Sequence, residues 1–220
     1  MKVPATFKPQ TDRYSLWRWL FIALGLVGFA ALAKEAHEGG INAIDQLALS
    51  LLHTPDTFSA NPPWVQVLTR DVTALGGFTV LSLICIFAVA LMLVYRQHRQ
   101  AAVFALTVIL SQALTEGVKA MIARPRPVLL SQADIVYSSS FPSGHATMSA
   151  GVYLTLTMII CRSSLHPSAR ALTLGAAIIL VLAIGITRIE LGVHWPTDVL
   201  AGWLLGSAIT LAVSPSPYES

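Results

Sequence analysis

The sequence predicts an all-α protein that crosses a membrane six times, as a six-transmembrane-helix bundle. Hydrophobic residues make up 55% of the 220 residues and charged residues only 11%, whereas soluble domains carry about 25% charged residues. So few charges cannot cover the surface of a soluble domain, and the mean hydropathy of +0.67 is typical of an integral membrane protein. The length suits one domain over residues 1–220.

Six apolar runs account for the predicted spans. Each approaches the roughly 17–25 residues that a helix needs to cross the hydrocarbon core, and helices satisfy their own backbone hydrogen bonds there. The first run follows a polar stretch and lacks a small-residue cleavage pattern, so we expect it to remain as a span. The last run is short, and flanking helix would lengthen it. The runs cover about residues 16–33, 78–95, 101–118, 146–161, 171–187 and 199–213.

The one long polar connection covers about residues 35–76, between the first and second runs. Apolar residues at helical spacing indicate a short amphipathic helix lying in the membrane interface. They are Ile44, Leu47, Leu51 and Leu52. Gly76 and Gly77 should break the structure just before the second span. The connection is either a plain connector with aromatic anchors or a lid over a site that is open to lipid.

A histidine and an aspartate stand four residues apart where the sixth span begins. This spacing lets the Asp198 carboxylate approach an imidazole nitrogen of His194, fixing its tautomer and supporting positive charge on the ring. Taken singly, Asp198 would be a helix cap and His194 an interfacial side chain. Arg188, six residues before His194, favours a catalytic pair beside an anion-binding cation instead.

A small flexible turn, Pro142-Ser143-Gly144-His145, opens the fourth span. Such a turn presents backbone N–H groups and the positive end of a helix dipole to an anion. The Ser143 hydroxyl adds a donor, and His145 at the rim could protonate a departing oxygen. Alone, the turn would be an ordinary helix start with an exposed histidine.

Cations follow the third span and end the fifth. Arginine holds phosphate oxygens in a bidentate fork and lysine acts as a compact charge, which favours Lys119, Arg126 and Arg188 as phosphate ligands. The alternative for such cations is anchoring at a membrane surface, and we expect no further role for Arg124. Glu116, one helical turn before Lys119, should steady that lysine.

Several other kinds of site are excluded by the sequence. The net charge of +3 comes without a basic tract, so a nucleic-acid partner is not expected. No Walker loop or GxGxxG string suggests a nucleotide. Cys85 and Cys161 have the setting of buried packing thiols. Near the motifs no carboxylate pair or His/Cys cluster has ligand spacing, so we expect no metal and no other cofactor. The oligomeric state is left open.

The distribution of lysine and arginine predicts the orientation. The side of the termini receives eight of these residues: Lys2, Lys8, Arg13, Arg18, Arg96, Arg99, Arg162 and Arg170. The other side receives six: Lys34, Arg70, Lys119, Arg124, Arg126 and Arg188. Setting aside the three proposed phosphate ligands leaves eight against three. We therefore expect cytoplasmic termini and an extracytoplasmic-facing active site in the inner (plasma) membrane.

The three strings together resemble the signature of the type-2 phosphatidate phosphatase superfamily. They are K-x6-RP at 119–127, PSGH at 142–145 and R-x5-H-x3-D at 188–198. Many members have Ser-Arg at the start of the third string, where this chain has Thr187 before Arg188. The stretch 70–76 also resembles the run before the second span in bacterial members.

The resemblance implies a metal-independent reaction through a phosphohistidine. His194 would attack a phosphate, His145 would act as leaving-group acid, and Asp198 would support His194. The implied phosphate-binding residues are Lys119, Arg126, Ser143, Gly144 and Arg188. It also implies a helical bundle whose site opens laterally to lipid.

A membrane lipid phosphate or diphosphate is the expected substrate. Undecaprenyl diphosphate is the first expectation, with a phospholipid monophosphate such as phosphatidate or phosphatidylglycerophosphate, or a lipid A phosphate, as alternatives. A lipid phosphotransferase, which passes the phosphoryl group to another lipid, would carry the same motifs. The alternative of another class is a catalytically silent lipid transporter or binding protein.

Overall fold

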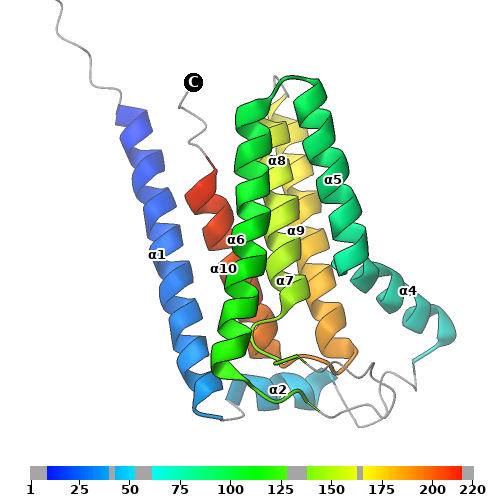
Figure 1. Ribbon diagram of the computed structural model, residues 1–220. Coiled ribbons are helices and arrows are strands. Elements are labelled where there is room, and N and C mark those ends of the chain that lie inside the picture. The colour runs from blue at the N-terminus through cyan, green and yellow to red at the C-terminus, as the bar shows by residue number, and fades with distance from the viewer. Residues whose placement is uncertain (1–8, 40–42, 53–60, 128–137, 163–165, 215–220) are drawn as a thin grey trace, which may run out of the picture.

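The structure is a computed structural model that describes residues 9–39, 43–52, 61–127, 138–162 and 166–214, and its regular elements are all helices. The long helices run side by side as a bundle (Figure 1). They are α1 (Pro9–His37), α5 (Phe78–Val94), α6 (His98–Ile122), α9 (Pro167–Glu190) and α10 (Pro196–Val213). The all-helical, multi-span prediction is confirmed.

All six predicted apolar runs fall on helices of this bundle. Within the described residues, five helical stretches are long and apolar enough to cross a membrane by themselves. A sixth span is reached if α4 (Pro63–Ala74) and α5 count as one, and these two helices meet at a bend of 44°. The bend lies at the predicted break, because Gly76 and Gly77 separate the two helices.

The fourth span is built from three consecutive pieces. It runs from α7 (Gly144–Ser149) through a π-helical turn, η1 (Ala150–Leu154), into α8 (Thr155–Cys161). A π turn carries one extra residue per turn and is often found near functional sites. Here it brings Gly151 so close to α6 that a Cβ on this glycine would lie 2.6 Å from Ser111 Oγ.

Small residues allow α10 to pack closely against the fourth span. A Cβ on Gly202 would lie 2.8 Å from Ser143 O, and one on Gly206 would lie 2.8 Å from Ala150 Cβ. Helix packing in a membrane gains little from hydrophobic burial, so backbone approach at small residues becomes the main source of close contact. This packing fixes the turn at Ser143 relative to the start of α10.

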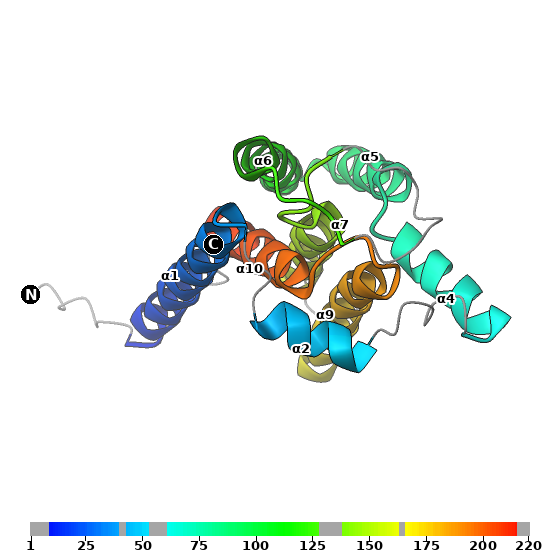
Figure 2. The ribbon, with the colours of Figure 1, turned by 90° about the horizontal axis from the view of Figure 1, so that it is seen from below.

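The predicted interfacial helix is present as α2 (Ala43–Leu52), which lies across one end of the bundle (Figures 1 and 2). Ile44 and Leu47 are exposed on it, whereas Asp45 is fully buried. Helix α4, the other helix of this connection, packs against α9. Parts of the predicted 35–76 connection, residues 40–42 and 53–60, lie outside the described residues.

Candidate active site

The structure brings the predicted site residues together at the end of the bundle that α2 crosses. Lys119 lies in the last turn of α6, Arg188 in the last turn of α9 and Asp198 in the first turn of α10. His145 lies in the first turn of α7, and His194 lies in the connection between α9 and α10. Helices far apart in sequence thus deliver the three motifs to one place.

The His194 ring is held between a guanidinium and a carboxylate. Its Nε2 atom is 3.2 Å from Arg126 Nη1, and its Nδ1 atom is 3.6 Å from Asp198 Oδ2, slightly beyond hydrogen-bond distance. Arginine can only donate, so Nε2 carries a lone pair and the ring proton lies on Nδ1, facing the carboxylate. This is the tautomer in which Nε2 can act as a nucleophile.

Asp198 is fully buried, and its carboxylate is held from several sides. The Trp195 backbone N–H donates to Oδ2 at 2.9 Å, which caps the first turn of α10. The Ser140 hydroxyl also donates to Oδ2. Arg124 Nη1 donates to Oδ1 at 2.6 Å. The carboxylate therefore has a fixed orientation toward the histidine.

Arg124 connects this carboxylate to a second one on α2, and our expectation that it only anchors the protein at the surface was wrong. It is 5% exposed, and its Nη2 atom is 2.7 Å from Asp45 Oδ2. Asp45 also accepts hydrogen bonds from the backbone N–H and the hydroxyl of Thr197, each at 2.9 Å. Asp45, Arg124 and Asp198 form a buried chain of charges, the acid–arginine–acid chain.

Lys119 and the Ser143-Gly144 turn form one wall of the site. A Cβ on Gly144 would lie 3.7 Å from Lys119 Nζ, so the ammonium lies directly beside the turn. The Ser143 hydroxyl is buried and has no hydrogen-bond partner among the residues that the structure describes. A buried donor of this kind suits an oxyanion. Glu116 lies 3.9 Å from Lys119 Nζ, in agreement with the predicted pairing.

Arg188 and His145 form the part of the site next to α4. Arg188 Nη1 donates to the Thr73 hydroxyl at 2.9 Å, and His145 lies close enough to Gly76 that a Cβ there would be 3.3 Å from its Cδ2. Thr73 was not among the predicted site residues, although it lies in the 70–76 stretch that resembled family members. Helix α4 thus positions a cation of the site.

Burial and charge set the protonation states outside the spans. Burial lowers the pKa of His194 to about 4, although Asp198 acts in the opposite direction, so the ring is neutral at pH 7. Burial also lowers the pKa of Arg126, and the Asp198 charge opposes this. An arginine with this shift keeps its charge at neutral pH. A neutral imidazole therefore faces a permanent cation.

An apolar groove reaches the site between α5 and α6. The part nearest the site, about 370 Å³, is lined by Gly144, His145 and Met148 together with residues of the two helices, most of them apolar. A second hollow of about 380 Å³ continues along α5 and α6. The two hollows share Cys85, Ile86 and Val108. Among the described residues of the 35–76 connection, Gly76 alone lines the groove, so the groove opens beside the end of that connection rather than beside α2.

The described residues contain no group of three or more His, Cys, Asp or Glu side chains that could hold a metal ion. Positive charge at the site comes from Lys119, Arg126 and Arg188.

Comparison with known proteins identifies relatives of this chain. The PAP2 superfamily matches residues 100–220. Phosphatidylglycerophosphatase B of Bacillus subtilis (strain 168) is 30% identical over 182 residues, which cover 81% of this chain and 85% of that protein. An undecaprenyl-diphosphatase of Sulfolobus acidocaldarius is 31% identical over 129 residues, which cover 55% of this chain and 57% of that protein.

Solved structures resemble this one in fold. The crystal structure of a transmembrane PAP2 type phosphatidylglycerolphosphate phosphatase from Bacillus subtilis matches with a TM-score of 0.72 and 26% identity, covering 87% of this chain and 93% of that one. The structure of Aquifex aeolicus LpxE matches with a TM-score of 0.56 and 24% identity, covering 72% and 91%.

Proposed function

This chain belongs to the PAP2 superfamily, and we propose that it removes phosphate from a membrane lipid through a phosphohistidine on His194. Its relatives are lipid phosphatases, and the chain is a phosphoric ester hydrolase of this family. The observation that carries the mechanism is the setting of His194. Its Nε2 lone pair faces Arg126 at 3.2 Å, and its Nδ1 faces Asp198.

The proposed reaction has two halves. In the first, the Nε2 lone pair attacks phosphorus, the P–O bond to the lipid breaks, and the departing oxygen takes a proton from His145. Asp198 supports the positive charge that develops on the His194 ring. In the second half, water gives a proton to His145 as its oxygen attacks phosphorus, the P–N bond breaks, its electron pair returns to Nε2, and inorganic phosphate leaves.

The positive charges of the site can neutralise the phosphate in both halves of the reaction. We assign Lys119, Arg126 and Arg188 to its oxygens, together with the Ser143 hydroxyl and the Gly144 N–H. Fixed donors aimed at developing negative charge are among the largest contributions to catalysis. The chemistry needs no metal, because three side-chain cations can neutralise the transferring group.

The groove between α5 and α6 supports a lipid substrate. An acyl or prenyl chain lying along Ile86 and Val108 would place its head group beside His145. Each buried CH₂ contributes about 0.8 kcal/mol, so a long chain can hold the phosphate in position for attack. Phosphatidylglycerophosphate and undecaprenyl diphosphate, the substrates in the names of the two curated relatives, are the first candidates.

The test is phosphate release from a panel of lipid mono- and diphosphates by purified protein in EDTA. We expect release from at least one lipid, with kcat/KM falling for a short-chain analogue, and a labelled phosphate that stays on the protein after an acid-free quench. His194→Ala should lower kcat by about 10⁴-fold or more. His37→Ala, on an exposed histidine at the same end of the bundle, is the matched control.

Three results would contradict the proposal. They are His194→Ala activity within tenfold of wild type, activity that is lost in EDTA and restored by Mg²⁺, and equal hydrolysis of a soluble sugar phosphate. Consumption of lipid phosphate without release of inorganic phosphate, when an acceptor lipid is present, would indicate the phosphotransferase instead.

We also propose that the termini are cytoplasmic and the site extracytoplasmic, from the lysine and arginine count. In a background with Cys85→Ser and Cys161→Ser, Glu38→Cys at the site end should react with a membrane-impermeant thiol reagent in intact spheroplasts. Gln97→Cys at the opposite end should not. The reverse labelling pattern would invert the topology.

A further inference from the structure

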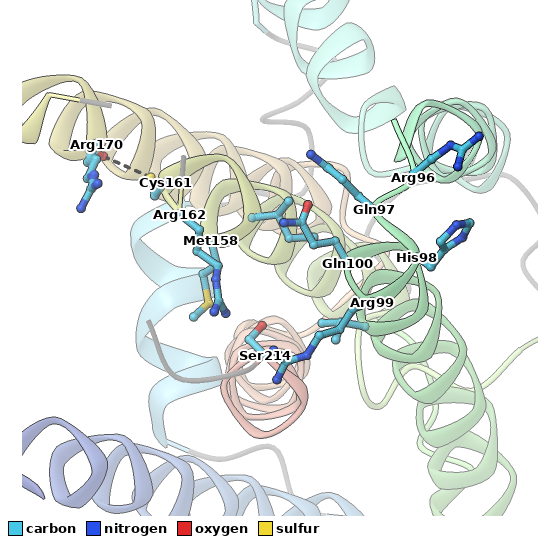
Figure 3. Close-up of a pocket in the computed structure, with 12 residues that line it drawn as sticks. Arg96, Gln97, His98, Arg99, Gln100, Met158, Cys161, Arg162, Arg170 and Ser214 are labelled. Atoms are coloured by element: carbon cyan, nitrogen blue, oxygen red, sulfur yellow. Dashed lines mark hydrogen bonds between the residues drawn. The ribbon is translucent and has the colours of Figure 1, made fainter. Parts of the chain in front are cut away.

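A cavity of about 480 Å³, separate from the groove between α5 and α6, lies at the end of the bundle opposite to His194 (Figure 3). It is lined by the turn between α5 and α6, the first turns of α6, the end of α8, the beginning of α9 and the residue that follows α10. The residues lining it are Arg96, Gln97, His98, Arg99, Gln100, Val103, Met158, Ile159, Cys161, Arg162, Arg170 and Ser214.

The polar part of this cavity is strongly basic. Four of the lining residues are arginines and one is a histidine, and among the described residues that line it none is acidic. Figure 3 shows Arg99 and Arg162 reaching toward Ser214 from different helices. These guanidinium groups create a positive potential that attracts an anion. Two arginines approaching from separate elements can each donate to the same phosphate oxygens.

The inner walls of the cavity are apolar. Val103 comes from α6, and Met158 and Ile159 come from α8. A soluble anion gains nothing from such walls, whereas a lipid places its phosphate among the arginines and its glycerol and chains against the apolar residues. The combination therefore favours an amphiphilic ligand.

The cavity cannot be part of the catalytic site. Arg99 and Lys119 lie on the same helix, 20 positions apart, and a helix rises about 1.5 Å per residue, so about 30 Å separates them. That distance matches the thickness of the hydrocarbon core. A lipid bound here would have its phosphate in the leaflet opposite to the one that presents substrate to His194.

We propose that this cavity binds the phosphate of an anionic phospholipid from the leaflet opposite to the active site, through Arg99 and Arg162. Basic pockets between transmembrane helices are a recurring way to hold such head groups. The lipid would connect the beginning of α6 to the end of α8 and so stabilise the bundle at this end. The proposal does not depend on the chemistry of His194.

The test measures lipid binding to delipidated protein in detergent. The probes are phosphatidylglycerol, phosphatidylcholine with the same chains, and inorganic phosphate, each titrated while the melting temperature is recorded, with native mass spectrometry counting retained lipids. The variant Arg99→Gln/Arg162→Gln removes two charges from the cavity. Lys34→Gln/Arg70→Gln removes two charges from exposed positions elsewhere and is the matched control.

We expect phosphatidylglycerol to bind at least tenfold more weakly to the Arg99→Gln/Arg162→Gln protein, with one fewer lipid retained, and the control to behave as wild type. Gln100→Glu, which places a negative charge in the cavity, should weaken binding independently. Because anions can also bind at the active site, the decisive quantity is the difference between wild type and the cavity variant. Equal phosphatidylglycerol binding by both proteins would overturn the proposal. An equal difference with phosphatidylcholine or with inorganic phosphate would overturn the assignment to an anionic lipid.

Discussion

Replacing Arg124 with glutamine tests whether the acid–arginine–acid chain orients the catalytic aspartate. The guanidinium is 2.7 Å from Asp45 and 2.6 Å from Asp198, and both carboxylates are fully buried. Arg124→Gln leaves two buried negative charges without their cation. Removing one partner of a buried ion pair costs about 3–5 kcal/mol, and we expect the free energy of unfolding to fall by that amount.

A double-mutant cycle separates this charge effect from a simple loss of packing. Asp45→Asn alone leaves the pair of Arg124 and Asp198 intact. A hydrogen bond to a charged group is worth about 1.5–3 kcal/mol, and we expect this variant to lower the free energy of unfolding by that amount. In the double variant only one buried carboxylate lacks the cation. The double variant should therefore be less destabilised than the sum of the single variants, by about 0.5–3 kcal/mol of coupling.

The assay is reversible unfolding in mixed micelles of increasing SDS content, followed by tryptophan fluorescence. Lys34→Gln, at an exposed position on α1, removes one positive charge from a surface pair and should change stability by less than about 1 kcal/mol. Phosphatase turnover is measured on the folded fraction. Since a small misplacement of a catalytic group can cost about 100-fold, Arg124→Gln should lower kcat more than it raises KM. Strictly additive stabilities, or an unchanged kcat, would refute the reasoning.

Two further predictions follow from the same geometry. Burial lowers the pKa of His194 to about 4, so the ring loses its nucleophilic lone pair only as the pH falls through that value. The acid limb of the pH profile of kcat/KM, corrected for substrate ionisation, should therefore lie near pH 4. An acid limb near pH 6.5, the ordinary pKa of histidine, would contradict the buried setting. A Cβ on Gly202 would lie 2.8 Å from Ser143 O, so Gly202→Ala should destabilise by about 1–3 kcal/mol and lower turnover. The control is Gly175→Ala in α9, whose added Cβ meets nothing within 4 Å. If both changes lowered stability and turnover equally, the close packing of α10 would be unimportant.

The spans and the approach of Asp198 to His194 could be predicted because both depend on residues that are close together in the sequence. Hydropathy is read within one helix. His194 and Asp198 are only four residues apart at the beginning of α10, so their approach follows from that short spacing. The break at Gly76 and the helix over Ile44 and Leu47 could also be predicted, because glycine pairs and apolar periodicity act over a few residues.

The buried chain of charges could not be predicted from one sequence. Arg124 and Asp45 are 79 residues apart, and no spacing rule connects them. Asp45 has the sequence setting of an ordinary acid in the first turn of a helix, and Arg124 that of a surface anchor. Ser140 lies 58 residues before Asp198 and is one serine in a serine-rich stretch. The packing of α2, the end of α6 and the fourth span around the beginning of α10 brings these groups together.

Asp198 joins the stability of the fold to the chemistry of the site. The same carboxylate caps α10 through the Trp195 N–H, pairs with Arg124 and faces the Nδ1 atom of His194. In a membrane the burial of apolar surface contributes little to helix association, so buried polar contacts carry more of the specificity. A shift of α10 by one turn against its neighbours would break the ion pair of Asp198 with Arg124 and the hydrogen bond from Ser140. It would also move His194 away from Arg126. The orientation of His194 therefore depends on the helix packing around it, and changes at Gly202 or Asp45, which do not touch a phosphate, should affect catalysis through this one side chain.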